Sequence, residues 1–239
     1  MTYESPSIAS KGLRGWSIPL PTRRRHKHWL ARWLNSPGCQ RLFDISFSLT
    51  VLILCAPLYA LLALLVALTS EGPIFYRQER VGKNFRPFGC IKFRTMIKNA
   101  DQKLAELMAS SPQLRAEFEA DFKLRRDPRV TPIGRFLRFT SLDEFPQFWN
   151  VLKGDMSVVG PRPLVPEEVP RYGRAMAKVL TVRPGITGLW QVSGRNDIPY
   201  TQRIQIDAYY ATYRTWWLDA LIVLKTVGVM LFPRQSGGY

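Results

Sequence analysis

The sequence predicts a mostly helical α+β protein that is associated with a membrane. Residues 45–68 form an apolar run without any charged residue, and the run is long enough for a membrane helix. Alternation typical of strands is limited to residues 74–96, which predicts a small β-hairpin. Much of the remaining chain has helical spacing, including the apolar segment 216–225. A net charge of +16 adds the expectation of an anionic partner.

The composition favours a polyanionic partner and a reducing compartment. Lysine and arginine number 34 in the 239-residue chain, against 18 aspartates and glutamates. Such an excess suits nucleic acid, an anionic membrane surface or phosphorylated substrates. The three cysteines, Cys39, Cys55 and Cys90, are widely spaced and form neither a disulfide framework nor a metal-ligand pattern. No apolar run directly follows an early basic segment, so a signal peptide is not predicted.

Residues 1–37 are predicted to be a basic, flexible leader. Positive charge is concentrated in the run at residues 23–29. Near an anionic lipid surface each basic residue adds about 1 kcal/mol of binding free energy, which favours an anchor for anionic membrane lipids. Charge blocks are equally typical of a disordered, solvated tail, and the residues leave both interpretations open.

The apolar run at residues 45–68 would form a helix of about 36 Å, enough to cross a hydrocarbon core of about 30 Å. Pro57 argues against a simple spanning helix, because it removes one backbone hydrogen bond and clashes with the carbonyl of Ile53. Ser48, Thr50 or packed protein could satisfy that carbonyl. A helix that breaks at Pro57 and returns to the same membrane face is the alternative.

Basic residues flank the apolar run evenly, so the positive-inside bias does not assign a cytoplasmic side. They are Arg25, Lys27, Arg32 and Arg41 before the run, and Arg77, Arg80, Lys83 and Arg86 after it. The residues alone are therefore compatible with a spanning helix and with a re-entrant one.

The predicted hairpin has a turn at residues 82–84 and basic residues along both strands. A solvated face explains these charges, and so does a site for an anionic lipid headgroup. The headgroup candidates are Arg77, Arg80, Lys92 and Arg94.

The segment at residues 98–124 predicts two polar helices separated by Ser110-Ser111-Pro112. Leu104, Leu107 and Met108 have helical spacing, and we expect them to contact the core. A short amphipathic stretch follows at residues 131–139. It leads directly to the candidate catalytic residues.

Ser141-Leu142-Asp143-Glu144 has the spacing of a capping box, with Ser141 at the cap and Glu144 three residues later. Pro146 is tolerated only in a first turn, so the helix start lies close by, and Asp143 is the alternative cap. Backbone N–H groups and the helix dipole would then keep the Asp143 carboxylate ionised, as a nucleophile or magnesium ligand requires. We expect this helix to end at Gly154.

Two arginines flank these acids. Arg138 precedes them, and Arg162 lies in the rigid turn Gly160-Pro161-Arg162-Pro163, which exposes a planar fork suited to phosphate. Adjacent acids diverge on a helix, so Asp143 and Glu144 do not make the facing pair of a glycosidase. One nucleophile with a neighbouring acid or metal ligand fits phosphoryl transfer better. Without the arginines, simple helix capping would explain the acids.

Two further segments admit two interpretations each. The loop at residues 183–197 surrounds Trp190 with turn-forming and polar residues, which suits either nucleotide binding or a structured loop with a buried tryptophan. The segment at residues 216–225 has an apolar face and two tryptophans, which suits an interfacial helix or a core helix. Asp219 and Lys225 make a membrane-spanning helix costly there.

Taken together, these features closely resemble the bacterial sugar transferase family, the monotopic polyprenyl-phosphate phosphoglycosyl transferases that start exopolysaccharide or O-antigen repeats. The resemblance covers the chain from about Gln40 to its C-terminus. It is carried by several motifs in fixed order, at residues 41–44, 72–76, 92–96, 141–147, 154–163 and 183–191.

The resemblance implies a re-entrant helix at residues 38–70, broken at Pro57, and a cytosolic catalytic domain at residues 71–239 with a C-terminal interfacial helix. It implies a bacterial protein at the cytoplasmic face of the inner membrane. The family commonly has Ser-Pro at the helix break, whereas this chain has Ala56-Pro57. The hydroxyl that could satisfy the broken backbone is therefore missing.

The same resemblance implies that Asp143 attacks the β-phosphate of a UDP-sugar, releases UMP and passes the phosphosugar to undecaprenyl phosphate. Glu144 would be the second member of the dyad, Arg138 and Arg162 would bind phosphate, and Mg²⁺ would sit by Asp143. The substrate-binding candidates lie in the loop at residues 183–197 and are Arg183, Gln191 and Arg195.

Residues 193–197, at the end of this loop, are more similar to family members that use UDP-galactose than to those that use UDP-glucose. UDP-glucose remains the alternative donor, and a non-catalytic scaffold of polysaccharide assembly is a further alternative. Nucleic acid is not expected as a partner, because no binding motif accompanies the charge. The oligomeric state, including a homodimer, is left open.

Overall fold

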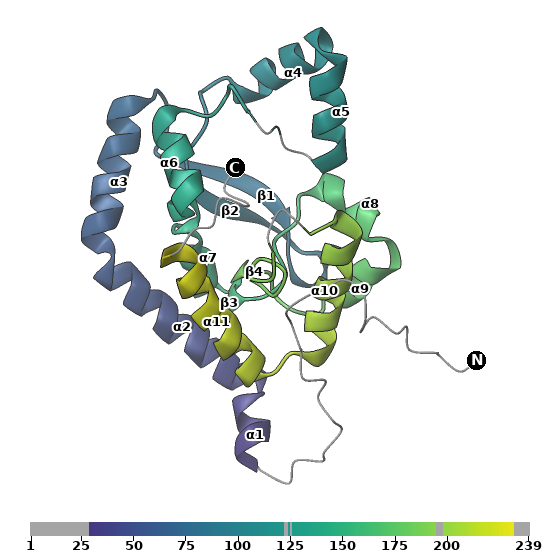
Figure 1. The fold of residues 1–239 in the computed structure, drawn as a ribbon. Coiled ribbons are helices and arrows are strands. Elements are labelled where there is room, and N and C mark those ends of the chain that lie inside the picture. The colour runs from purple at the N-terminus through teal and green to yellow at the C-terminus, as the bar shows by residue number, and fades with distance from the viewer. Residues whose placement is uncertain (1–28, 122–123, 125, 195–197, 232–239) are drawn as a thin grey trace.

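The computed structural model describes residues 29–121, 124, 126–194 and 198–231. Helices dominate this part of the chain, and two small two-stranded sheets accompany them (Figure 1), which confirms the predicted α+β class. Most of the basic leader lies outside the described residues. Its last part includes a short helix, α1 (Trp29–Leu34), which we did not predict.

The apolar run forms two helices, α2 (Pro37–Leu54) and α3 (Ala56–Thr69), which meet at an angle of 65°. The break falls at Cys55 and places Pro57 in the first turn of α3, where its missing N–H costs no helical hydrogen bond. Among the described residues, no single helix has the length and apolar composition to cross a membrane, whereas the bent α2–α3 pair has both when taken together.

The backbone at the break is satisfied without a hydroxyl group. The N–H of Cys55 donates to the carbonyls of Val51 and Ile53, and the N–H of Tyr59 donates to the carbonyl of Cys55 at 2.8 Å. Of the partners that we considered for the freed carbonyl, namely Ser48, Thr50 or packed protein, Ser48 does not serve. The Ser48 hydroxyl is buried and has no hydrogen-bond partner among the described residues.

The hairpin consists of β1 (Phe75–Val81) and β2 (Pro87–Phe93), which pair antiparallel from Phe75↔Phe93 to Val81↔Pro87. A short 3-10 turn, η1 (Lys83–Phe85), joins the strands, and Asn84 adopts φ 55° there. The predicted hairpin and its turn are therefore confirmed.

The two polar helices are α4 (Ala100–Ser110) and α5 (Pro112–Asp121), as predicted. They extend away from the rest of the fold (Figure 1). Leu104, Leu107 and Met108 are only half-buried, so the expectation that they contact the core is wrong. These helices therefore lie outside the main core. They line one side of the cavity that is described below.

Helix α6 (Pro132–Thr140) is the predicted amphipathic stretch, and the Thr131 hydroxyl caps its start by accepting from the N–H of Gly134 at 3.0 Å. A 3-10 turn, η2 (Leu142–Glu144), separates α6 from α7 (Gln147–Lys153). Helix α7 ends at Gly154 in the left-handed region, as expected from the sequence.

A second sheet pairs β3 (Ser157–Val159) parallel to β4 (Gly185–Thr187). A Cβ atom on Gly160 would lie 2.4 Å from the carbonyl oxygen of Arg183, so the close approach of the two segments requires glycine. The chain between the strands forms short helical turns: η3 (Pro166–Glu168), α8 (Val169–Tyr172), η4 (Gly173–Ala175) and α9 (Met176–Val179).

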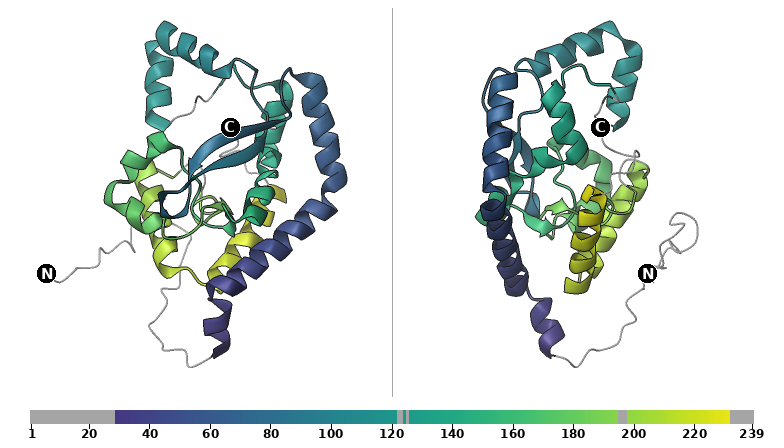
Figure 2. Two further views of the ribbon diagram at one scale, coloured as in Figure 1. Left: turned by 180° about the vertical axis from the view of Figure 1, so that it is seen from behind. Right: turned by 60° about the vertical axis from the view of Figure 1, so that its left-hand side comes forward.

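Two longer helices, α10 (Tyr200–Tyr213) and α11 (Trp216–Leu231), complete the described fold. Viewed from the side, α2 and α3 lie at one edge and α10 and α11 at the other, with α6, α7 and the strands between them (Figure 2). The Tyr210 hydroxyl donates to the Asp219 carboxylate at 2.6 Å and thereby joins α10 to α11.

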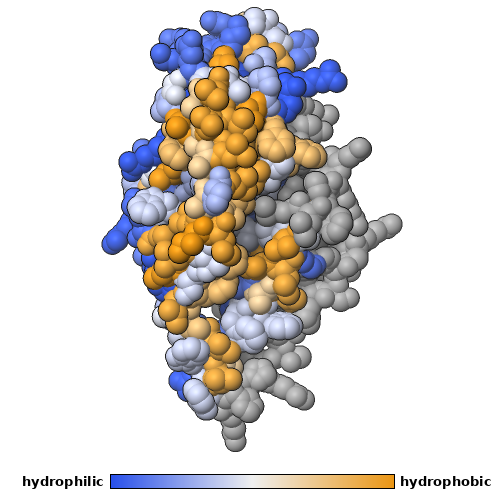
Figure 3. Space-filling view, turned by 90° about the vertical axis from the view of Figure 1, so that its left-hand side faces the viewer, coloured by the Kyte–Doolittle hydropathy of each residue, from blue (hydrophilic) through white to orange (hydrophobic). Residues whose placement is uncertain are grey.

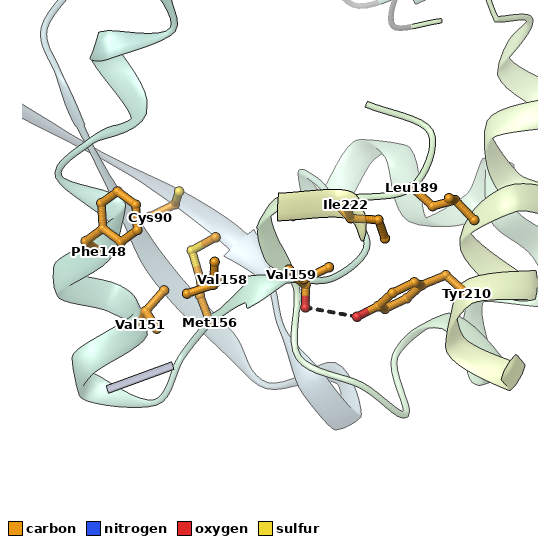
Figure 4. Packing of buried hydrophobic residues seen from close by; sticks show 9 residues of the cluster. All are labelled: Cys90, Phe148, Val151, Met156, Val158, Val159, Leu189, Tyr210 and Ile222. Carbon is orange, nitrogen blue, oxygen red and sulfur yellow. Dashed lines mark hydrogen bonds between the residues drawn. The ribbon is translucent and has the colours of Figure 1, made fainter. Parts of the chain in front are cut away.

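The main core lies where β2, α7 and β3 meet α10 and α11. Figure 4 shows its buried members, among them Cys90, Phe148, Met156, Tyr210 and Ile222. The Tyr210 hydroxyl also lies 3.2 Å from the carbonyl oxygen of Val159, which keeps this polar group satisfied inside the core.

Two residues of α2 fasten the apolar helix to this core. Arg41 donates to the carbonyls of Val151 and Leu152 at the end of α7, at 2.5 and 2.6 Å. The buried carboxylate of Asp44 accepts from the Ser157 hydroxyl and from the Val158 N–H, both at 2.9 Å. The first helix of the pair is therefore fixed to the strand and helix that follow the paired acids.

The outer side of α2 and α3 is apolar. Figure 3 shows an apolar column along these two helices and a second apolar patch at the place of α11. The exposed large hydrophobic residues of the three helices are Leu42, Phe43, Leu49, Ile53, Leu54, Leu61, Leu64, Leu68, Trp216, Trp217, Leu224 and Val227. A patch of this kind is typical of a surface that meets lipid or another protein.

Candidate active site

The two acids lie in the turn between α6 and α7 rather than at a helix start. Ser141 adopts φ 59°, ends α6 through its own N–H and makes no side-chain cap bond. The predicted capping box is therefore wrong, and Asp143 is not a cap either. The reason is that α6 continues to Thr140, so a left-handed residue is needed to redirect the chain before Pro146.

The carboxylate of Asp143 is buried, with 8% of the residue exposed. Burial raises its pKa to about 6, and the Glu144 charge acts in the same direction. Lys92, Arg138 and Arg162 oppose this rise. The helix dipole that we invoked is therefore not the cause of its ionisation; neighbouring cations keep it charged at neutral pH.

No hydrogen bond from the described residues reaches the Asp143 carboxylate. Its oxygens are thus available to a substrate or an ion. A buried carboxylate that is charged and unbonded is the arrangement that an attacking nucleophile needs.

The second acid, Glu144, is engaged by cations. Its Oε1 atom lies 2.8 Å from Lys92 Nζ and 3.8 Å from Arg162 Nη1. Burial opposes its ionisation, but the charges of Lys92 and Arg162 outweigh burial and lower its pKa to about 2. Glu144 is therefore a fixed anion at neutral pH and is poorly suited to carrying a proton.

The two predicted phosphate-binding arginines come together at the acids. Arg138 lies in the last turn of α6, and its Nε donates to the Thr95 hydroxyl at 3.0 Å. Arg162 reaches the site from the turn after β3 and faces Glu144. Together with Lys92 they surround the space next to Asp143 with positive charge, as phosphate binding requires.

This space is part of a cavity of about 790 Å³. Its polar end contains Lys92, Arg138, Asp143, Glu144 and Arg162. The wall on one side comes from α4 and α5, through Leu104 and Phe118 among others. The volume lies within the range of small-molecule and cofactor sites, about 300–1,000 Å³.

Not all of the basic hairpin residues suit a headgroup site. Arg94 is buried and donates to the carbonyls of Val66 and Ser70 at the end of α3. Arg80 is buried and donates to the carbonyl of Pro163 at 2.9 Å. Both still line the cavity, but their guanidinium groups are already engaged by protein carbonyls, so a headgroup role for these two stays a prediction. Lys92 is paired with Glu144, and Arg77 is exposed.

The three substrate-binding candidates have different positions. Arg183 does not line the cavity; its Nε donates to the carbonyl of Gly154 at 2.9 Å, so its role as a substrate ligand is not supported. Gln191 does line the cavity, and its Oε1 atom is buried without a partner among the described residues. Arg195 lies outside the described residues.

Trp190 is buried and lines the cavity, and the Arg203 guanidinium lies 5.1 Å from the centre of its ring. The buried tryptophan of one interpretation is therefore confirmed, and the loop also reaches the cavity, while nucleotide binding by this loop stays a prediction. Its indole N–H has no partner among the described residues.

Three further residues matter to the site and were not assigned there from the sequence. Lys92 pairs with Glu144, Thr95 orients Arg138, and Asn150 joins α7 to β2. Lys92 and Thr95 belong to the motif at residues 92–96, so the motif itself was a signal. Nothing in the sequence around Asn150 distinguishes it from an ordinary helix residue.

The carboxylates near Asp143 fit a magnesium ion only together with substrate oxygens. Among the described residues, no group of three or more potential metal ligands lies close enough to hold an ion. Magnesium usually takes one or two carboxylates and completes its octahedron with water and substrate phosphates. Asp143 fits that role, because its oxygens are unbonded, whereas Oε1 of Glu144 is held by Lys92.

The fold and the site define an α+β protein class in which a bent apolar helix pair accompanies a buried carboxylate surrounded by arginine and lysine. The family model for bacterial sugar transferases matches residues 35–233. The chain belongs to the bacterial sugar transferase family.

Named relatives extend the comparison. The undecaprenyl-phosphate galactose phosphotransferase of Salmonella typhimurium is 49% identical over 205 residues, which cover 86% of this chain and 42% of the relative. The exopolysaccharide production protein ExoY of Rhizobium meliloti is 43% identical over 197 residues, 82% of this chain and 87% of the relative. The undecaprenyl-phosphate glucose phosphotransferase of Komagataeibacter xylinus is 34% identical, over 98% of this chain and 44% of the relative.

The chain therefore spans less than half the length of the relatives from Salmonella typhimurium and Komagataeibacter xylinus, but most of the length of ExoY. The shared part includes all of the site described above.

Proposed function

We propose that this protein transfers a hexose 1-phosphate, by preference galactose 1-phosphate, from a UDP-hexose to undecaprenyl phosphate and releases UMP. The observation that carries the proposal is the buried, unbonded carboxylate of Asp143 facing Lys92, Arg138 and Arg162. The name of the relative from Salmonella typhimurium supports galactose and undecaprenyl phosphate, and the name of the relative from Rhizobium meliloti supports a role in exopolysaccharide production.

In the first step a carboxylate oxygen of Asp143 attacks the phosphorus that carries the hexose. The bond from this phosphorus to the bridging oxygen breaks, its electron pair stays with that oxygen, and UMP leaves. An aspartyl phosphohexose remains on the enzyme. Arg138 and Arg162 hold the phosphate oxygens and counter the charge that develops on them in the transition state.

In the second step a phosphate oxygen of undecaprenyl phosphate attacks the same phosphorus. The bond between phosphorus and Asp143 breaks, which restores the carboxylate and gives undecaprenyl diphosphate hexose. Neither step requires the enzyme to supply or accept a proton when the phosphates react as anions. A fixed anion at Glu144, which holds Lys92 and Arg162 in place, is consistent with such a mechanism.

Asp143 would hold Mg²⁺ together with diphosphate oxygens of the donor. When bound, Mg²⁺ would supply positive charge that neutralises part of the diphosphate and favours departure of UMP. The chemistry of the donor set supports this cofactor, since a single free carboxylate beside a diphosphate is a usual arrangement for magnesium.

We infer that the α2–α3 pair enters the cytoplasmic leaflet of the bacterial inner membrane and returns, with the basic leader against anionic lipid. The 65° bend and the apolar outer side support this topology. Tags at both termini should be accessible from the cytoplasm alone. A periplasmic N-terminal tag would refute the re-entrant arrangement.

The decisive test of the reaction is UMP release by the purified protein with undecaprenyl phosphate, Mg²⁺ and a panel of UDP-sugars. We expect turnover with UDP-galactose and none by the Asp143→Asn variant. Preference for UDP-glucose would change the donor but keep the chemistry. Normal turnover by Asp143→Asn would exclude the covalent mechanism, and inactivity with every donor would favour a scaffold.

A further inference from the structure

The cavity at Asp143 continues into an apolar arm between α2 and α11. The arm is lined by Phe47 and Val51 from α2, by Cys55 at the break that follows α2, by Phe148 from α7, and by Val223 and Val227 from α11. Phe47, Val51 and Cys55 are spaced four apart, so they lie on one side of α2 and its C-terminal cap. The polar end of the same cavity carries Asp143 and its surrounding cations.

Helices α2 and α11 are held apart on a common support. Both pack against β3, and α11 is fixed to β4 by a 2.7 Å hydrogen bond between Thr226 and Thr187. Asp44 fixes α2 to β3 through Ser157 and Val158. The arm is therefore a preformed feature, because both of its walls are anchored to the small sheet.

We propose that this apolar arm binds the part of the isoprenoid chain nearest to the phosphate of the lipid acceptor, a proposal that rests on the function above. A ligand that fills the whole cavity must be anionic at one end and apolar at the other. A polyprenyl phosphate has this composition, with its phosphate at Arg138 and Arg162 and its first isoprene units between α2 and α11.

The outer end of the arm leads to an apolar surface. Val227 is 50% exposed, and its neighbour on α11, Leu224, is 69% exposed. Figure 3 shows this patch beside the apolar column of α2 and α3. The distal isoprene units can thus leave the arm for apolar surroundings without exposing the chain to water, which makes burial of the proximal units favourable.

The walls of the arm argue against the nucleotide as its occupant. A nucleobase has several donors and acceptors, and burying them without partners costs free energy. Thr226, the polar side chain of α11 that lines the cavity, is already bonded to Thr187 and to the carbonyl of Ile222. Gln191 and Trp190 have unpartnered polar atoms and lie in the loop after β4, which suits the nucleotide better.

The native cysteines give a direct binding test. Cys55 and Cys39 are both half-buried and lie at opposite ends of α2, but Cys55 lines the cavity and Cys39 does not. The wild-type protein in detergent is treated with N-ethylmaleimide, and labelling of each thiol is followed by peptide mass spectrometry. Undecaprenyl phosphate should slow labelling of Cys55 severalfold and leave Cys39 unchanged, whereas inorganic phosphate should protect neither.

Two outcomes of this test would overturn the proposal. One is unchanged labelling of Cys55 at concentrations of undecaprenyl phosphate that saturate turnover. The other is protection by UDP-galactose rather than by the lipid, which would assign the arm to the nucleotide.

A pair of variants tests the same arm by kinetics. Val223→Trp fills the arm, whereas Leu30→Trp adds the same side chain at an exposed apolar position on α1 that does not line the cavity. We expect Val223→Trp to raise KM for undecaprenyl phosphate by about tenfold, as loss of a fitted apolar contact would. Leu30→Trp should leave that KM unchanged, and Val227→Trp replaces Val223→Trp if the latter does not fold.

The exchange of labelled UMP into UDP-galactose without lipid separates the two proposals. This reaction needs Asp143 and the donor but no acceptor, so Val223→Trp should leave it unchanged. Exchange that falls in parallel with lipid turnover, or an unchanged KM for the lipid, would exclude the arm as the lipid site. Absence of exchange in the wild-type protein would instead count against the proposed function.

Discussion

Lys92 Nζ lies 2.8 Å from Glu144 Oε1, and this ion pair joins the second strand of the hairpin to the turn that carries both acids. Lys92 is also the strongest of the charges that lower the pKa of Asp143 against burial. One lysine therefore acts on both members of the dyad, through a contact with one and through its field on the other.

The first prediction concerns this lysine. Lys92→Met leaves Glu144 with Arg162, at 3.8 Å, as its remaining ion-pair partner among the described residues and removes positive charge beside Asp143. We expect kcat/KM for UMP release to fall by at least about tenfold, equivalent to about 1.4 kcal/mol of transition-state stabilisation. Lys103→Met, in an exposed pair with Glu106 on α4, is the control and should keep wild-type kinetics. Wild-type kinetics for Lys92→Met would exclude a role for the pair in catalysis.

The second prediction is that Asp143→Asn is inactive but more stable than the wild-type protein. Burial raises the pKa of Asp143 to about 6, so ionisation above that pH destabilises the folded state. The amide removes this cost, which is about 1–3 kcal/mol at neutral pH after allowance for the coupled charges. Thermal unfolding with EDTA present should show a higher Tm at pH 7.5. The gain should disappear near pH 3.5, where both forms are neutral, and a lower Tm at pH 7.5 would contradict the argument.

The third prediction concerns pH and a buried carboxyl group that does not line the cavity. Asp207 is buried on α10, accepts from the Tyr172 hydroxyl at 2.9 Å, and has a pKa raised by burial to about 7. Stability that depends on its protonated form is present below about pH 4 and is lost as pH rises through 7. Wild-type Tm should therefore fall between about pH 4 and 7, and Asp207→Asn should reduce this fall. An identical pH dependence in the variant would show that Asp207 does not titrate in this range.

Much of the fold follows from local patterns in the sequence. The hairpin, the paired polar helices, the amphipathic α6 and the end of α7 at Gly154 were all predictable, because turn residues and periodicity determine them. The break at Cys55 follows from the tolerance of a first turn for Pro57. Local sequence patterns do not, however, determine which helix packs on which strand, so the tertiary arrangement could not be predicted.

The site was predictable in its charged members but not in its geometry. Asp143, Glu144, Arg138 and Arg162 do come together, as the motifs indicated. The capping box failed because Ser141 has a left-handed backbone, which a local pattern does not show. Arg183 has the right residue type, yet tertiary packing directs it to a backbone carbonyl of Gly154.

The fourth prediction tests the support of the site by Asn150, which is fully buried. Its Oδ1 accepts from the N–H of Ile91 at 3.0 Å and its Nδ2 donates to the carbonyl of Gly89 at 2.8 Å. Asn150→Leu leaves both backbone groups buried without partners, so we expect a loss of about 2–4 kcal/mol in the free energy of unfolding. The same substitution at exposed Asn99, which makes no cap bond, should change it by less than about 0.5 kcal/mol. Equal effects at both positions would contradict this role.

The fifth prediction concerns the contact between α6 and the chain after β2. A Cβ atom on Gly134 would lie 2.0 Å from the carbonyl oxygen of Thr95, so Gly134→Ala must move α6 away from it. Thr95 also receives the hydrogen bond from Arg138 Nε, and the shift therefore displaces Arg138, for which we propose phosphate binding. We expect a lower Tm together with a higher KM for UDP-galactose. Gly228→Ala, on α11 with nothing within 4 Å of the added atom, is the matched control and should keep both values. A Gly134→Ala protein with unchanged Tm and KM would show that α6 can move without affecting Arg138.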